Sequence, residues 1–487
     1  MQNLWLNKTI YLSLFLFLLG VGSTAICADK KTNIQNVAQQ DIISDFEELY
    51  RRLQKAHYNL YVNRSKQEFD KHFLTLKESI DHDMTISQAT LLFQELASFA
   101  NIAHTKIDLP TQDYMNFRKA GGKAFPLFIK VIDDKVYVAE NYSNQSNIKI
   151  GDEVVGLNKH SIKKVLNDLR RFKSADNDRM FYGFLEFEFP MLLWFEFGEL
   201  DSYDIQIKGK DGNKRVTVST IGYEDLIEKM EQRKGLLELG FERIAKVSDQ
   251  IGYLRPGPFF NTEPNATNVW DNVSFKRFID DSFKKFVDEK AKAILIDMRN
   301  NPGGDNSFSD YMLKKFANKD FKFASSFKVK VSSEFIDANE KRLKNSSDMS
   351  YKYQQAYKDL SEGDIFEFNL PLNQAEQNIL KKPVYMLINR HSYSNAVTTA
   401  ALAQDYGFAT IMGEETNDLA TTYGAMEAFE LSKTGIAVSF PKAHIIRPNG
   451  EVNAHGVMPD LIIKTPLVEY AEDTVLQEAL KEIEARL

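Results

Sequence analysis

The segment from Val384 to Glu414 places a serine at the start of a helix. Its sequence, VYMLINRHSYSNAVTTAALAQDYGFATIMGE, reads as an apolar strand, a serine-bearing loop, an apolar helix and a second strand. A helix N-terminus presents unpaired backbone N–H groups and a positive dipole end, which stabilise an oxygen that becomes negative during acyl transfer. Ser394 is therefore a candidate nucleophile. Serine is also a common N-cap residue, so on this segment alone a capping role is the stronger interpretation.

A second strand, turn and helix strengthen the catalytic interpretation. The apolar run AILID at Ala293–Asp297 is followed by MRNNPGGDN and by a helical pattern from Ser307 to Phe316. Gly303 and Gly304 allow a backbone N–H to approach a ligand closely, because glycine has no Cβ. Alone, the segment would be a tight turn between a central strand and a helix. Two such turns in one domain suggest the two halves of an oxyanion hole.

Three blocks in this order resemble the tail-specific (C-terminal processing) and tricorn-core family of serine peptidases: ILIDMRNNPGG, LINRHSYSNAVTTAALAQDYGFATIMGEET and HGVMPDLII. The resemblance covers residues 241–487. It implies a Clp-protease/crotonase-like catalytic domain built from ββα units.

Carried over by position, the resemblance implies that Ser394 is the nucleophile. The backbone N–H groups of Asn395 and of Gly303 or Gly304 would then stabilise the oxyanion. Ser392 is the rival nucleophile. The family's Gln-Asp-x-Gly element, here Gln404 to Gly407, favours Ser394.

The base differs from that of many bacterial members, in which a lysine follows a Gly-Glu-x-Thr-x-Gly element. This chain has Leu419 at that position, and the nearby Lys433 falls in a predicted turn. The chain is more similar to the tricorn-core and retinoid-binding-protein-like branch, which supplies a histidine from a His-Thr pair after an N-terminal helix. That resemblance implies His104 as the general base. Without it, His104 would read as a histidine favoured by the negative end of a helix dipole.

The same branch orients its histidine with a preceding serine and a glutamate near the Gly-Val-x-Pro-Asp block. Here Ala103 precedes the histidine, and the glutamate position falls on Asn453, with Glu451 two residues earlier. Glu451 and Asn453 are therefore candidates to orient the imidazole of His104. The alternative is that neither residue orients it. An asparagine can fix a tautomer, although it stabilises an imidazolium less than a carboxylate does.

Composition and charge limit the classes of function. The 487 residues include 61 Lys and Arg and 68 Asp and Glu, for a net charge of -7, which argues against binding a nucleic-acid backbone. The single cysteine and the lack of an HExxH motif predict neither a metal site nor a cofactor. This length predicts about two to four domains. The oligomeric state stays open.

The first 27 residues read as a secretory signal peptide. Lys8 precedes an apolar stretch from Ile10 to Val21 and the small residues Ser23 to Ala25. The stretch is short for a membrane span, so no integral span is expected after its removal. We expect an exported protein, periplasmic or extracellular. Lipid anchoring at Cys27 is the less favoured outcome, because Ile26 replaces the small residue expected before such a cysteine.

Two further domains are expected before the catalytic domain of residues 240–487. Residues 38–110 read as a helical bundle, whose third helix begins with a capping box of Thr85 and Gln88. The three helical segments are Ile42 to Leu60, Lys66 to Ile80 and Ile86 to Ala100. Residues 120–222 alternate at strand spacing and resemble a PDZ-like module. The expected fold class is thus multidomain, α+β and α/β.

The PDZ-like resemblance implies that Phe125 and Leu127 lie where an extended peptide adds as a strand. Packing of this small β-domain against the catalytic domain is an equally favoured alternative.

Together these features predict an exported serine peptidase that cleaves protein or peptide substrates through an acyl-enzyme. The main alternative is a non-catalytic binding protein for apolar ligands or peptides on the same fold, and an esterase or amidase would use the same chemistry. A serine at the nucleophile position and an intact Pro-Gly-Gly turn favour the enzyme, because a carrier needs neither.

Overall fold

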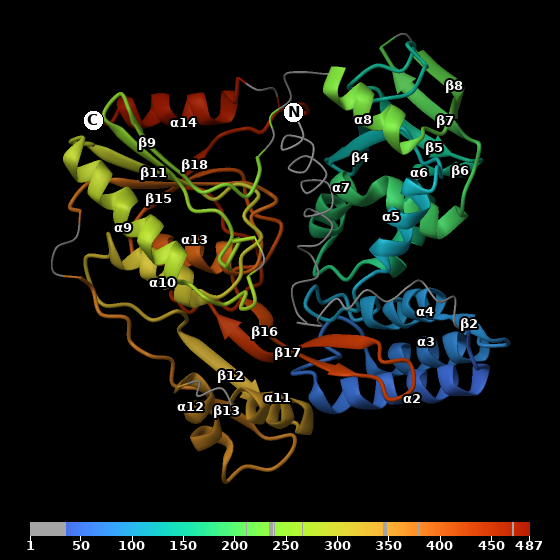
Figure 1. Cartoon of the computed structure of the whole chain (residues 1–487), viewed down its shortest axis with the longest axis horizontal. Helices are drawn as coiled ribbons and strands as arrows, with labels where there is room; N and C mark the ends of the chain where they lie inside the picture. Colours follow the sequence, from blue (N-terminus) through green and yellow to red (C-terminus); the bar gives the residue numbers. More distant parts are fainter. Residues whose placement is uncertain are drawn as a thin grey trace. The chain divides into compact units, whose positions relative to one another are not determined.

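The computed structural model describes residues 36–487, except 211, 233–236, 238, 265, 344–347, 377–379 and 470–471. The predicted signal peptide, with Cys27, lies outside the described residues. The described residues divide into two compact units: those of unit 1 fall in the ranges up to 234, 329–366 and 423–443, and those of unit 2 in the ranges 235–328, 367–422 and 444–487. Both contain helices and strands, which confirms the predicted mixed, multidomain fold (Figure 1). None of the described helices is long and apolar enough to cross a membrane.

The predicted helical bundle is present in unit 1. It consists of α2 (Gln39–Ala56), α3 (Lys66–Glu78) and α4 (Ile86–Ser98). The capping box of α4 forms as predicted, because Thr85 Oγ1 accepts from the N–H of Gln88, and the Gln88 side chain accepts from the N–H of Thr85. The rings of Phe46, Phe69 and Phe93 are fully buried in the core of the bundle.

The strands expected in residues 120–222 form one sheet in unit 1, with strand order β3-β4-β5-β7-β8 and β6 paired with β5. The strands are β3 (Leu127–Ile132), β4 (Lys135–Asn141), β5 (Glu153–Leu157), β6 (His160–Ser161), β7 (Ser202–Gly209) and β8 (Gly212–Ser219). The helices around it are α5 (Thr111–Lys119), α6 (Ile162–Leu169), α7 (Asp178–Phe197) and α8 (Tyr223–Gln232). The predicted hairpin turns at Asp133 and Asp134, whose φ angles of 49° and 59° suit a tight hairpin turn.

The residues predicted to receive a peptide lie at the start of β3. Leu127 is fully buried, and the ring of Phe125 packs edge-on against Phe189 and Tyr203, with ring centroids 5.6 and 5.0 Å apart. Strand β3 is at the edge of its sheet and contacts α7. Peptide capture, like the PDZ-like assignment itself, stays a prediction.

Unit 2 is built around a six-stranded sheet of order β18-β15-β14-β11-β10-β9. Its strands are β9 (Ile244–Ser248), β10 (Ile251–Arg255), β11 (Ala293–Asp297), β14 (Val384–Ile388), β15 (Thr410–Gly413) and β18 (Leu461–Ile462). Neighbouring strands from β10 to β18 are parallel, and only β9 pairs antiparallel. Parallel neighbours need crossover connections, and helices supply them.

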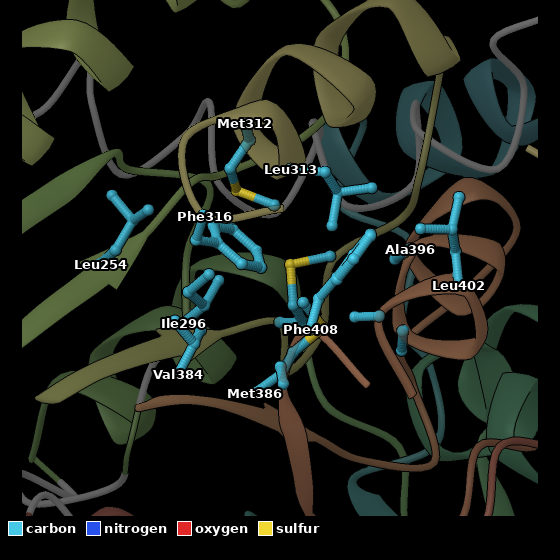
Figure 2. Close-up of a cluster of buried hydrophobic side chains, with 14 of the residues drawn as sticks. Leu254, Ile296, Met312, Leu313, Phe316, Val384, Met386, Ala396, Leu402 and Phe408 are labelled. Carbon is cyan, nitrogen blue, oxygen red and sulfur yellow. The ribbon is translucent and has the colours of Figure 1, made fainter. Parts of the chain in front are cut away.

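Helices cover both faces of this sheet (Figure 1). They are α9 (Val273–Asp288), α10 (Asn306–Lys314), α13 (Asn395–Asp405) and α14 (Thr474–Glu484). On one face, side chains of α10 and α13 such as Met312 and Ala396 pack with Ile296 and Met386 of the strands (Figure 2). On the other face, α14 packs its apolar residues on Leu387 and its neighbours. The central strands β10, β11 and β14 are therefore buried on both sides, as their continuous apolar sequences predict.

A further four-stranded sheet has the order β13-β12-β17-β16. Its strands are β12 (Ser326–Lys330), β13 (Ile365–Glu367), β16 (Thr422–Glu430) and β17 (Ala437–Ile446). Residues 329–366 of unit 1 also carry α11 (Ser333–Leu343) and α12 (Asp348–Tyr357).

A buried ion cluster fixes the chain where it leaves β11. Arg299 donates to both carboxylate oxygens of Asp297 at 2.8 and 3.0 Å and to both oxygens of Asp473 at 2.8 Å. Tyr253 also donates to Asp297, at 2.9 Å. Burial alone would raise the pKa of Asp297, but the charges of Arg299 and Arg255 and the hydrogen bonds from Arg299 outweigh it and lower the pKa to about 2.

We predict that Asp297→Asn lowers the free energy of unfolding by about 3–5 kcal/mol at pH 7, because it leaves a buried charge under-compensated. The folded pKa of Asp297 is depressed, so this stability is present above pH 4 and is lost as the pH falls toward 2. Urea unfolding followed by circular dichroism measures the change. The control is Asp288→Asn, which breaks an exposed ion pair with Lys284 and should cost less than about 1 kcal/mol. Equal losses in the two variants would contradict the prediction.

Candidate active site

Ser394 occupies the N-cap position of α13, in the loop that follows β14. Its backbone has φ 52° and ψ -123°, a conformation that L-residues rarely adopt and that costs of order 1–3 kcal/mol. Its side chain is partly exposed and makes no capping hydrogen bond. The hydroxyl is therefore available, and the simple capping interpretation of this serine does not hold.

The loops after β11 and β14 are joined to each other by hydrogen bonds. The N–H of Tyr393 donates to the carbonyl of Asn301 at 2.9 Å, and the side-chain amide of Asn389 donates to Asn300 Oδ1 at 2.8 Å. These contacts follow from the register of the strands, because Asp297 at the end of β11 lies opposite Leu387 of β14. Parallel neighbours thus bring the two turns predicted from the sequence to the same edge of the sheet.

Gly303 lies directly against the nucleophile loop. It has φ 82°, and a Cβ at this position would lie 2.6 Å from the Asn395 nitrogen and 2.9 Å from the Ser394 Cβ. Only glycine fits this contact. Gly304, with φ 134°, approaches the backbone of Phe259 equally closely, since its Cβ would lie 2.2 Å from the Phe259 oxygen.

The backbone N–H groups around Ser394 differ in their partners. The N–H of Gly303 donates to Asn301 Oδ1 at 2.9 Å, so it is already bonded. The N–H groups of Gly304 and Asn395 donate to no atom of the described residues. The side chain of Asn395 donates to Ser309 Oγ at 2.9 Å, which ties the first turn of α13 to α10. The first residue of α13 and the residue after Gly303 thus each have an N–H without a partner among the described residues.

The rival nucleophile Ser392 is fully buried. Its hydroxyl donates to the carbonyl of Met298 at 2.9 Å and accepts from the N–H of Asn389 at 3.2 Å. These bonds place Ser392 in a structural role that joins the two loops.

Asp418, which the sequence did not single out, touches the nucleophile loop. Its Oδ2 accepts from the N–H of Ser394 at 2.5 Å, and its Oδ1 accepts from the N–H of Leu419 at 2.8 Å. Burial raises the pKa of this carboxyl to about 6, although the two N–H groups oppose the rise. The sequence offers one signal for Asp418: it is an acidic residue that directly precedes Leu419, and Leu419 stands where the Ser-Lys peptidases have their lysine.

His104 lies in unit 1, just after α4. It is buried, and burial together with the charge of Lys106 lowers its pKa to about 4, although a hydrogen bond with the backbone of Tyr423 opposes this. The imidazole is therefore neutral at pH 7, which is the form that a general base requires. Pairing of His104 with Ser394 of unit 2 stays a prediction.

The segment that carries His104 is held by a second buried histidine. His57 Nδ1 accepts from the N–H of Asn59 at 3.0 Å, so the proton resides on Nε2, which donates to Thr105 Oγ1 at 2.7 Å. Burial and the charge of Lys330 lower the pKa of His57 to about 3. His57 therefore stays neutral and anchors the residue next to His104.

The candidate orienting residues lie in unit 2. Glu451 Oε2 accepts from His455 Nε2 at 3.1 Å and lies 3.8 Å from an Arg447 nitrogen. The other ring nitrogen of His455 donates to the carbonyl of Gly456 at 2.6 Å, and these bonds raise the pKa of His455. With both nitrogens donating, these bonds favour the protonated form of the His455 ring. Asn453 is exposed, and an orienting role for either Glu451 or Asn453 stays a prediction.

Within the part of the chain that the structure describes, no three His, Cys, Asp or Glu side chains are grouped so as to hold a metal ion.

Residues 250–463 match the model of peptidase family S41. No curated protein matches the chain. Among solved structures, mature CPAF is similar with a TM-score of 0.58 and 14% identity over 92% of this chain and 96% of that chain. The CPAF complex with lactacystin is similar with a TM-score of 0.57 and 14% identity over 91% of this chain and 97% of that chain. The photosystem II D1 C-terminal processing protease has a TM-score of 0.43 and 14% identity over 89% of this chain and 96% of that chain. At this identity, the CPAF structures show a shared fold.

We predict that Gly303→Ala lowers kcat/KM for peptide hydrolysis by roughly 10²-fold or more, because the new Cβ would displace Ser394 and the Asn395 N–H. The matched control is Gly435→Ala, in the hairpin turn between β16 and β17. Gly435 has a similar φ of 68°, and a Cβ added there would meet no atom within 4 Å. The Gly435→Ala variant should therefore lose about 1–2 kcal/mol of stability and keep its kcat/KM unchanged. Full activity in the Gly303 variant would show that the contact is unimportant.

Proposed function

We propose that this chain, a serine-type peptidase that contains a peptidase family S41 domain at residues 250–463, uses Ser394 and His104 to hydrolyse peptide bonds through an acyl-enzyme. One observation carries the proposal. Ser394 is held at the start of α13 in a strained backbone conformation, its hydroxyl does not cap the helix, and the N–H of the next residue, Asn395, has no partner among the described residues. Strain of this kind is typical of functional positions.

In the proposed first step, Ser394 Oγ attacks the carbonyl carbon of the scissile bond and its proton passes to His104. The tetrahedral oxyanion accepts hydrogen bonds from the N–H groups of Asn395 and Gly304, near the positive end of the α13 dipole. Collapse of the intermediate breaks the C–N bond, and His104 donates its proton to the leaving amine. Water then attacks the acyl-enzyme by the same route and releases the second product.

Of the two glycines predicted for the oxyanion hole, Gly304 is the better donor. The N–H of Gly303 is engaged by Asn301 Oδ1, and the amide nitrogen of Asn301 donates to the carbonyl of Gly257 at 2.8 Å. This second bond fixes the orientation of the Asn301 amide. Gly303 then contributes by allowing close approach, and Gly304 by donating its N–H.

The buried environment of His104, the proposed base, keeps its imidazole neutral at neutral pH. A histidine of pKa about 4 is neutral above pH 5, so it accepts the serine proton throughout the neutral range. Its weak basicity is the cost of burial, and stabilisation of the oxyanion must supply the remaining rate enhancement.

We further propose that the protein is exported and acts on protein or peptide substrates. Export rests on the signal-peptide pattern of the first 27 residues, and the substrate class rests on the S41 domain.

The proposed roles predict that Ser394→Ala and His104→Ala each lower kcat for a fluorogenic peptide by about 10⁴-fold or more. Ser219→Ala and His160→Ala are the controls, since both residues are exposed on strands of unit 1, Ser219 on β8 and His160 on β6, and both variants should keep the wild-type kcat. Circular dichroism would check that each variant is folded. Turnover that survives in the Ser394 or His104 variant contradicts the role of that residue. A folded wild type that binds peptides without cleaving them would indicate a binding protein.

A further inference from the structure

We propose that Asp418 is a positioning residue of the active site, whose ionised carboxylate holds the backbone of Ser394 in the conformation from which its hydroxyl attacks. This inference rests on the proposed function. It adds a residue that neither the motifs nor the family resemblance designated.

The carboxylate of Asp418 is built into the site. Its side chain is buried, with the residue 1% exposed, and each oxygen accepts one backbone N–H, from Ser394 and from Leu419. The loop that carries it is fixed as well, because Thr416 Oγ1 donates to the carbonyl of Asp418 at 2.8 Å and accepts from the N–H of Val457 at 2.9 Å. Asp418 therefore presents a rigid acceptor to Ser394.

This bond meets a specific need of the nucleophile. A φ of 52° at a residue with a Cβ is maintained only where the surroundings hold it, and the N–H of Ser394 is the backbone group on which a neighbour can act. A charge-assisted hydrogen bond is roughly twice as strong as a neutral one. The bond also occupies the Ser394 donor, so that the oxyanion meets the N–H groups of Asn395 and Gly304.

The electrostatic surroundings leave Asp418 dependent on these N–H groups. Its raised pKa of about 6 results from burial opposed by the two hydrogen bonds, and no charged side chain is among the causes. The segments that are hydrogen-bonded to its loop carry two ion pairs. In one, Arg390 pairs with Glu414, and in the other, His455 pairs with Glu451.

Protonation removes the interaction. Below pH 6 one carboxylate oxygen becomes an O–H donor that faces a backbone N–H, so the hold on Ser394 weakens. His104 titrates lower, at a pKa of about 4, so the two ionisations are separable.

The test is the pH dependence of kcat for wild type, Asp418→Asn and Asp310→Asn. We expect the wild-type acid limb near pH 6. Asp418→Asn should lower the plateau of kcat by roughly 10²-fold, change KM less than about twofold, and move the acid limb toward pH 4, because an amide does not titrate. Asp310 is the matched control, since it is a buried carboxyl of unit 2 with a pKa also raised to about 6, held by Asn306 and Asn373. Its variant should keep the limb near pH 6.

A second measurement needs no variant. The rate at which a fluorophosphonate labels wild-type Ser394 should fall below pH 6. A limb near pH 4 in the wild type, or an unchanged limb and kcat in Asp418→Asn, overturns the positioning role while the proposed function stands. Absence of both turnover and labelling in the wild type overturns the proposed function itself.

Discussion

The parallel pairing of β11 with β14 determines the geometry of the candidate site. The two strands are separated in sequence by almost 90 residues, yet they leave the sheet at the same edge, with Asp297 opposite Leu387. A glycine-rich turn follows one strand and a serine-bearing turn follows the other. Because the Gly303 backbone contacts the first turn of α13, the turns act as one rigid structure. The buried cluster of Asp297, Arg299 and Asp473 fixes the direction in which the first turn begins.

Within that structure, each nearby backbone N–H has a distinct role. Gly303 donates to Asn301, and Ser394 donates to Asp418, whereas Asn395 and Gly304 have no partner among the described residues. An uncapped serine followed by an N–H that has no partner among the described residues is suited to acyl transfer. The strained backbone of Ser394 and the burial of the Asp418 carboxyl both cost free energy of folding. Strained residues and carboxyls with a shifted pKa are both typical of functional sites.

Patterns that depend on near neighbours in the sequence were predicted well. The apolar runs of β11 and β14, the start of α13 and the capping box at Thr85 all follow from local periodicity or short-range hydrogen bonding. Helix α2 was placed a few residues late, over 42–60 where the structure has Gln39–Ala56, because the pattern continues past the point where His57 turns extended.

Contacts between distant residues could not be read from the sequence. The bond of Asp418 to Ser394 spans 24 residues, and the bond of His57 to Thr105 spans 48. Whether Gly303 or Gly304 has a free N–H depends on where the Asn301 side chain points, and the partner of Glu451 depends on the fold of the loop that carries His455.

The most direct test of the central claim, that Ser394 is a nucleophile activated by His104, is to label the purified mature protein with a fluorophosphonate and locate the adduct by peptide mass mapping. The account predicts an adduct on Ser394 in the wild type that is lost in His104→Ala. An adduct on Ser392, or labelling of Ser394 that is unchanged without His104, would contradict it.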